Sequence, residues 1–162
     1  MAELLPRFMV CHMLEEVPED YQFSIWPPHL TIVPWFSVKE EALLNTLLAI
    51  EETARKVGSF AIKAKEKAWY GPRNDVLVTE VEDTTGRLLK LHHSLLQSIQ
   101  SNGGTILDLT YTDENYSPHV TLTEGSGGLQ QDQIQSCSSI TVVEKKQREM
   151  EDKQVVEVIS LV

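Results

Sequence analysis

Apolar residues alternate with polar residues in several short segments of the chain, and two longer segments carry a helical repeat. Alternation places successive side chains on opposite faces of a strand, whereas a spacing of three and four places them on one face of a helix. The pattern predicts strands over residues 8–14, 30–36, 60–68, 76–81, 140–144 and 155–161. It predicts helices over residues 39–57 and 85–101, and a third, short helix over residues 129–135.

Glycine and turn residues separate these elements. Gly58 ends the first predicted helix, and Asn102-Gly103-Gly104 ends the second. Residues 69–75 join two predicted strands through a Gly-Pro and an Asn-Asp pair, which favours a turn between antiparallel strands. The sequence Gly125-Ser126-Gly127-Gly128 predicts a flexible break that serves as a turn.

The order of strands and helices recurs coarsely in the two halves of the chain. This recurrence predicts an α+β fold with two pseudo-symmetric lobes, in which antiparallel sheets surround a central cleft and helices lie on the outside. A length of 162 residues and a hydrophobic content of 41% fit one soluble domain that spans residues 1–162.

One four-residue pattern occurs twice, once in each half of the chain. The copies are His29-Leu30-Thr31-Ile32 and His119-Val120-Thr121-Leu122, and a proline precedes each of them. In an extended strand the histidine and threonine of one copy share a face, while the two apolar residues point into a core on the other face. Each copy is therefore predicted to contribute half of one polar site.

These motifs and their contexts, Trp26-Pro27-Pro28-His29 and Tyr116-Ser117-Pro118-His119, resemble those of the 2H phosphoesterases. That family includes the 2′-5′ RNA ligase-like and cyclic nucleotide phosphodiesterase proteins, and the resemblance spans most of the chain. It implies the same two-lobed fold and hydrolysis of a 2′,3′-cyclic phosphodiester. It also implies that His119 acts as base toward water and His29 as acid toward the leaving oxygen, with these roles exchanged for RNA ligation.

The residue types themselves favour acid/base chemistry at a phosphate. Two imidazoles that hold one proton between them present a base and an acid at the same time near neutral pH. The hydroxyls of Thr31 and Thr121 can donate to the non-bridging phosphate oxygens. Two histidines and two hydroxyls do not form a closed zinc site, so we expect neither a metal nor another cofactor.

Charge limits the expected substrate. The formal net charge of −10 disfavours a generic electrostatic grip on a long nucleic acid, so a small cyclic nucleotide fits better than an extended RNA. Arg73, with Lys63, Lys65 and Lys67 as further candidates, is the cation that we expect to bind substrate. The candidates to stack on a nucleobase are the aromatic residues near the motifs, Trp26, Trp35, Phe36, Trp69, Tyr70 and Tyr116. Of these we expect Trp35 and Tyr116 to bind substrate.

Other residues of interest are assigned structural places. His92 and His93 are neighbours on a predicted helix, where their directions differ by about 100 degrees, and we expect His92 at a boundary and His93 in solvent. Glu124 follows the second motif closely, and a carboxylate beside the motif would disfavour a phosphate. Cys11 and Cys137 are expected to be free buried thiols.

Two alternatives to a hydrolase stay open. One is a 2′-5′ RNA end-joining ligase, which would need an extended basic surface to hold two strands. The other is a nucleotide-binding module without turnover, which the presence of both histidines disfavours. Because the first fourteen residues lack a leader and no segment reaches membrane-spanning length, we expect a cytoplasmic protein. We also expect a monomer whose partner is a small cyclic nucleotide or an RNA terminus.

Overall fold

The computed structural model describes residues 5–122, 128–146 and 152–162. Within these residues it has two α-helices, α1 (Glu40–Val57) and α2 (Arg87–Ser101), and a short 3-10 helix, η1 (Asp113–Asn115). Ten strands complete the described part: β1 (Arg7–Met13), β2 (Gln22–Phe23), β3 (His29–Ser37), β4 (Phe60–Tyr70), β5 (Val76–Asp83), β6 (Thr105–Ile106), β7 (His119–Thr121), β8 (Ile134–Cys137), β9 (Ser139–Lys145) and β10 (Lys153–Ser160).

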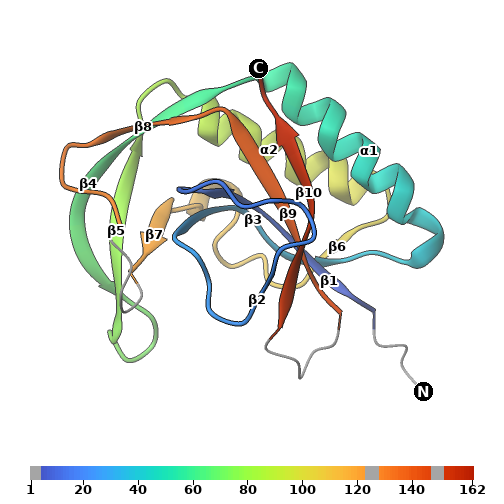
Figure 1. The fold of residues 1–162 in the computed structure, drawn as a ribbon, viewed down its shortest axis with the longest axis horizontal. Helices are drawn as coiled ribbons and strands as arrows, with labels where there is room; N and C mark the ends of the chain where they lie inside the picture. The colour runs from blue at the N-terminus through green and yellow to red at the C-terminus, as the bar shows by residue number, and fades with distance from the viewer. Residues whose placement is uncertain (1–4, 123–127, 147–151) are drawn as a thin grey trace.

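The strands form one antiparallel sheet in the order β2-β10-β9-β1-β3-β7-β5-β4-β8, with β6 paired to β3 beside this path. Figure 1 shows the sheet as a strongly curved surface, with β4, β5 and β8 on the left and β1, β9 and β10 on the right. The N-terminal strand β1 and the C-terminal strand β10 lie on either side of β9 in the right-hand part, because β9 pairs with both of them. The expected α+β fold is confirmed, with β3 and β7 in the middle of the sheet.

Both helices pack against each other, and α2 also contacts β3, β4 and β5 (Figure 1). Their apolar stripes form the main core with the inward residues of the sheet, among them Leu30, Ile32 and Val120. A second, smaller core cluster lies on the opposite face of β1, β9 and β10 and consists of Met9, Cys11, Met13, Phe23, Val143 and Val155. The sheet therefore has one face covered by helices and one face that they leave uncovered.

Both helices end where the sequence predicts, just before a glycine. Gly58 has a φ of 81°, and its N–H donates to the carbonyl of Ala54 at 2.9 Å. Gly103, two residues after the end of α2, has a φ of 97°. Both values lie in the left-handed region, where glycine meets no side-chain penalty, so the chain turns away from the helix at these positions.

The prediction of a helix over residues 129–135 is wrong. Residues 131–132 form a turn, and Ile134–Cys137 is strand β8, which pairs with β4 from Phe60 to Lys63. Asp132 and Ala64 extend this pairing, since the Asp132 N–H donates to the Ala64 carbonyl at 2.9 Å. A helix of seven residues is marginal in water, while the edge of β4 offers unpaired backbone groups, and the strand therefore prevails.

Some expectations fall partly on residues that the structure does not describe. Of the predicted Gly-Ser break, positions 125–127 lie outside the described residues, and so does Glu124. The central cleft between two lobes stays a prediction. Neither helix in the described part of the chain is long and apolar enough to cross a membrane.

Candidate active site

The two motif strands are direct neighbours in the sheet. β3 and β7 pair antiparallel with Leu30 opposite Val120, and both of these side chains are fully buried in the main core. In an antiparallel pair this register sets His29 opposite Thr121 and sets the histidine of β7 opposite the threonine of β3. Because side chains alternate along a strand, all four polar motif residues lie on the face that the helices leave uncovered.

This register makes His29 and His119 diagonal neighbours. Diagonal positions on one face of an antiparallel pair are about 7–8 Å apart, a separation that leaves room for one phosphate group between two imidazoles. The two rings also influence each other electrostatically. Burial is the largest cause that lowers the pKa of His29, and the charges of His119 and Lys153 lower it further, against the carbonyl of Pro27, which raises it.

Both imidazoles are oriented in the same way. The Nδ1–H of His29 donates to the carbonyl of Pro27 at 2.9 Å, and the Nδ1–H of His119 donates to the carbonyl of Ser117 at 2.8 Å. In each motif the acceptor is the residue two positions earlier, and a carbonyl can only accept, so Nδ1 carries a hydrogen in both rings. Nε2 is therefore the atom of each ring that can take up or release a proton.

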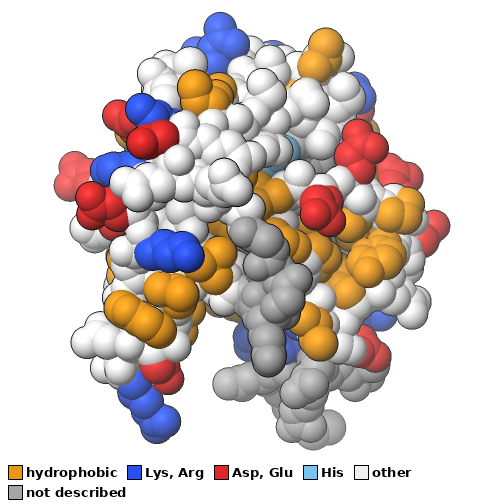
Figure 2. All heavy atoms as spheres, turned by 60° about the vertical axis from the view of Figure 1, so that its left-hand side comes forward, with side chains coloured by type: hydrophobic (Ala, Val, Ile, Leu, Met, Phe, Trp, Pro, Cys, Tyr) orange, Lys and Arg blue, Asp and Glu red, His pale blue; other side chains and the backbone are white. Residues whose placement is uncertain are grey.

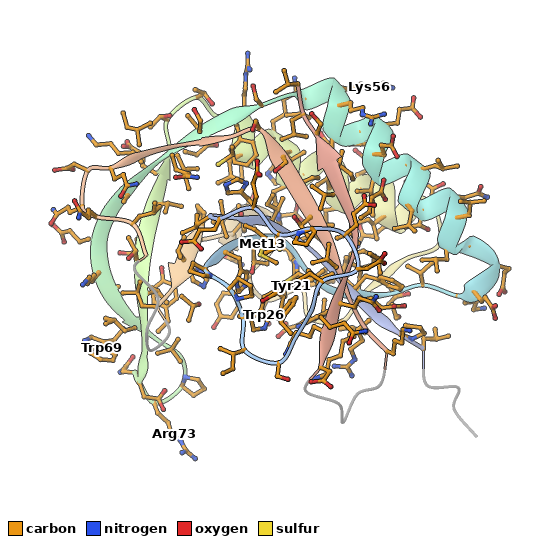
Figure 3. All side chains as sticks on the ribbon, viewed as in Figure 1. Met13, Tyr21, Trp26, Lys56, Trp69 and Arg73 are labelled. Carbon is orange, nitrogen blue, oxygen red and sulfur yellow. The ribbon has the colours of Figure 1, made fainter. Side chains whose placement is uncertain are left out.

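An aromatic ring and a cation lie beside His29. The Trp26 ring stacks on the imidazole with a centroid distance of 4.1 Å and an interplanar angle of 27°. The ammonium of Lys153 on β10 lies 5.5 Å from the centroid of the Trp26 ring. Figure 3 places Trp26 near the middle of the molecule, close to Met13, which is the partner of His29 in the pairing of β1 with β3. His29 therefore has an apolar and positively charged environment.

The environment of His119 differs. Its partner on β5 is Glu80, so the carboxylate of Glu80 lies on the same face as the imidazole. The hydroxyl of Tyr70 donates to Glu80 Oε2 at 2.7 Å and lies 3.0 Å from Ser117 Oγ, and the Tyr70 ring approaches His119 edge-on at 4.9 Å. Burial and the nearby carboxylate raise the pKa of Tyr70, so its phenol stays protonated and can keep donating.

Two stacked rings hold the backbone of β3 at its motif. The hydroxyl of Tyr116 donates to the carbonyl of Thr31 at 2.7 Å, and the Nδ1–H of His92 donates to the carbonyl of Ile32 at 2.6 Å. The two rings lie 4.0 Å apart and are almost parallel. His92 Nε2 accepts a hydrogen bond from the N–H of Asp113 at 3.0 Å. We call this pair of rings the His92–Tyr116 clamp.

The clamp also bears on metal binding. Among the described residues, the group of potential ligands that converge within 4.8 Å is His92, His93 and Asp113. Both ring nitrogens of His92 already have backbone partners, so this group does not fit a metal ion.

The family model described as the 2'-5' RNA ligase superfamily matches residues 8–145. The chain belongs to this superfamily. Its fold is similar to that of a solved phosphoesterase, with a TM-score of 0.68, 13% identity and 99% of both chains covered. It is equally similar to Escherichia coli LigT complexed with 3'-AMP, with a TM-score of 0.67, 13% identity and 99% of both chains covered.

A curated relative from Bacillus licheniformis is provisionally named a phosphoesterase. It is 22% identical over 105 residues, which cover 65% of this chain and 57% of the relative, so the match spans little more than half of the relative's length. LigT has also been solved with ATP and with NADP+.

The three residues that the sequence predicts to bind substrate lie in different parts of the fold. Trp35, on β3, is half-buried, and its ring lies 6.1 Å from that of Trp26, which connects it to the His29 side of the site. Tyr116 belongs to the clamp, and one face of its ring is covered by His92. Arg73 lies at the exposed tip of the hairpin between β4 and β5, away from the middle of the molecule (Figure 3). The substrate-binding roles of these residues stay predictions.

The lysines of β4 lie at the surface or beside a carboxylate. Lys65 and Lys67 are exposed, and Lys63 lies 4.0 Å from the carboxylate of Asp132. On the face drawn in Figure 2, the basic side chains of the described residues stand apart from one another among acidic ones. This face therefore offers a long phosphate backbone no continuous basic band among the described residues.

Sequence reasoning missed two residues that lie around the histidines, Glu80 and Lys153, and it did not foresee that Trp26 stacks on the imidazole of His29. The Trp-Pro-Pro-His context was a usable signal for Trp26, because two prolines restrict the chain and keep the indole near the imidazole. Glu80 and Lys153 follow no motif, since their positions depend on the pairing of β5 with β7 and on the course of β10.

Proposed function

We propose that this chain is a metal-independent phosphoesterase that hydrolyses 2′,3′-cyclic phosphodiesters of nucleotides or RNA ends by His/His acid-base catalysis. The observation that carries the proposal is the pairing of β3 with β7, in which Leu30 lies opposite Val120 and the two histidines are diagonal neighbours on one face. The superfamily match supports the same class of activity.

Hydrolysis of a cyclic phosphodiester needs two proton transfers on opposite sides of phosphorus. A base takes a proton from the attacking water, and an acid gives a proton to the departing ribose oxygen. The oxygen of water forms a bond to phosphorus as the bond from phosphorus to one ribose oxygen breaks, and the product is a nucleoside monophosphate. His29 and His119 approach a phosphate from two different strands, as this in-line geometry requires.

The threonines supply hydrogen-bond donors between the two rings. Thr31 and Thr121 share the face of the histidines, and both are half-buried. Negative charge grows on the non-bridging phosphate oxygens in the transition state, and fixed hydroxyl donors stabilise it there. Typical losses for removing one such donor are about 10²–10³-fold in kcat.

Substrate size follows from charge. The chain has a net charge of −10, and on the face of Figure 2 its described basic side chains are dispersed. A mononucleotide with a 2′,3′-cyclic phosphate carries one negative charge at the reacting group, whereas each further nucleotide of an RNA adds another. We therefore expect small cyclic nucleotides to be turned over with a higher kcat/KM than cyclic phosphates at the ends of long RNAs.

The test is hydrolysis of adenosine 2′,3′-cyclic phosphate in the presence of excess EDTA, with the nucleoside monophosphate measured by chromatography. We expect turnover, and a loss of at least about 100-fold in kcat/KM for His29→Gln and for His119→Gln, since acid-base groups contribute about 10²–10⁴-fold. His93→Gln, an exposed histidine on α2, is the matched control and should keep wild-type activity. Activity that survives both active-site substitutions, or that EDTA abolishes, overturns the proposal.

A further inference from the structure

An open groove of about 600 Å³ lies next to the candidate active site, on the face of the sheet that the helices leave uncovered. Met13 lines this groove and belongs to the second core cluster, which lies on that face. The same residue is the cross-strand partner of His29, and Figure 3 places it near the middle of the molecule. Because neighbouring strands lie about 4.8 Å apart, the β9 residues of the groove lie about 10 Å from β3.

The floor of the groove carries hydroxyl groups from β9 and β10. Ser139 and Thr141 lie two positions apart on β9 and share one face, and Ser160 on β10 lies opposite Ser139. All three line the groove. Thr141 is only 2% exposed, and no partner for its hydroxyl is found among the described residues. Buried hydroxyls are normally hydrogen-bonded, so Thr141 points to a ligand that supplies the missing partner.

The segment that follows β1 forms a wall with two carboxylates. Glu16 and Glu19 line the groove. The wall is attached to β10, because Glu19 Oε1 accepts a hydrogen bond from the N–H of Val158 at 3.2 Å. The N–H of Asp20 also donates to the carbonyl of Val155 at 2.9 Å. Among the described residues that line the groove none is a lysine or an arginine, so its negative charge has no counterpart there.

The surroundings of Glu19 hold more carboxylates than cations. Burial, together with the carboxylates of Glu51 and Glu19, raises the pKa of Glu157 to about 7. Arg55 acts in the opposite direction, but its guanidinium already forms an ion pair with Glu51. Three carboxylates therefore face one guanidinium, and a positively charged ligand relieves this repulsion.

We propose that the groove binds a primary ammonium group, carried either by a free linear polyamine or by an amine-bearing substrate. An ammonium has three N–H donors and no acceptor, which matches the hydroxyl and carboxylate oxygens of the groove. The carboxylates exclude a phosphate. A quaternary ammonium has no N–H and binds best in an aromatic cage, and no described residue that lines the groove is aromatic.

The first test is isothermal titration calorimetry of the full chain with spermidine, at low ionic strength and near neutral pH. We expect saturable binding, and a Kd that Glu16→Gln and Glu19→Gln each raise at least about fivefold, because a charged acceptor becomes a neutral one. Glu15→Gln is the matched control. It removes the same charge from the same segment at an exposed position outside the groove, and should change Kd by less than about twofold.

Two further comparisons test the donor and acceptor pattern. Thr141→Val replaces the buried hydroxyl by a methyl group and should also raise Kd, with urea unfolding to show that the variant is folded. Ser160→Ala tests the same floor at an exposed position. In competition with spermidine, ethanolamine should bind at least about tenfold more tightly than choline, which differs by three N-methyl groups. Equal affinities for these two amines, or equal effects of Glu15→Gln and Glu19→Gln, overturn the proposal.

Steady-state kinetics separates the two sources of the ammonium, and only this arm rests on the proposed function. The substrate 5′-amino-5′-deoxyadenosine 2′,3′-cyclic phosphate is compared with adenosine 2′,3′-cyclic phosphate. A KM at least about fivefold lower for the amine, abolished by Glu19→Gln, assigns the ammonium to the substrate. Equal KM values with spermidine binding assign it to a free polyamine. Equal KM values without spermidine binding overturn the proposal. If neither compound is hydrolysed, the proposed function fails, while spermidine binding still decides the present inference.

Discussion

The His92–Tyr116 clamp predicts a large stability loss from one substitution that keeps an aromatic ring at position 92. In His92→Phe the six-membered ring still stacks on Tyr116, but the donor to the Ile32 carbonyl and the acceptor for the Asp113 N–H are both lost. Ile32 and His92 have no solvent exposure, so water cannot replace the lost partner of Ile32. A buried backbone group without a partner costs about 1–3 kcal/mol. Asp113 lies at an exposed turn, where water can take over part of the loss.

The expected total for His92→Phe is therefore about 2–4 kcal/mol of unfolding free energy. Tyr116→Phe removes only the hydroxyl that donates to Thr31, and should cost about 1 kcal/mol. His93→Phe is the control on the same helix, because His93 is exposed and bonds only a surface carboxylate among the described contacts, and it should change stability by less than about 0.5 kcal/mol.

The assay is urea unfolding at pH 8 and at pH 5.5. Burial is the largest cause that lowers the pKa of His92, so the unfolded chain binds the proton more readily than the folded one. The stability that neutral His92 contributes is present above pH 6.5 and is lost as the pH falls through the lowered pKa. His92→Phe should therefore lose less stability between pH 8 and pH 5.5 than the wild type. A cost below about 1 kcal/mol at pH 8 would refute the role of the clamp.

Three further predictions concern the core and the surface of the same fold. Leu30→Ala should cost about 2–5 kcal/mol in urea unfolding, because the Leu30 side chain is fully buried on the core face of the motif strand. Leu89→Ala, on the exposed side of α2, should cost less than about 0.5 kcal/mol, and equal costs would contradict this core assignment. Burial and the nearby Glu51 carboxylate raise the pKa of Glu157 to about 7, so the stability of its protonated form is present below the ordinary glutamate pKa and is lost as the pH rises through 7. In urea unfolding, Glu157→Gln should gain about 1 kcal/mol at pH 8, after allowance for solvent screening, and almost nothing at pH 4; an equal gain at both pH values would contradict the raised pKa. The native protein should resist thiol reagents until it unfolds, because Cys11 and Cys137 are free and buried, with the pKa of Cys137 raised to about 12; rapid labelling of the native protein would argue against that burial.

The sequence by itself determined the local geometry of the motifs. Side chains alternate along any strand, so His29 and Thr31 had to share one face and Leu30 the other, whatever partner the strand found. The same local rules located both helices and the strand bounds to within a few residues, because periodicity and helix-ending glycines act over one or two turns of chain. The two free cysteines also followed from composition and are confirmed.

Only the tertiary structure decided which segments meet. Residues 129–135 lack a strong pattern of their own, and the open edge of β4 made Ile134–Cys137 a strand. His92 and Tyr116 became a clamp through a stack between segments that are distant in sequence. The pairing of Leu30 with Val120 joins positions ninety residues apart, and the neighbours Glu80 and Lys153 arrive through other strands. Local patterns cannot encode such contacts, because they depend on the packing of the whole sheet against its helices.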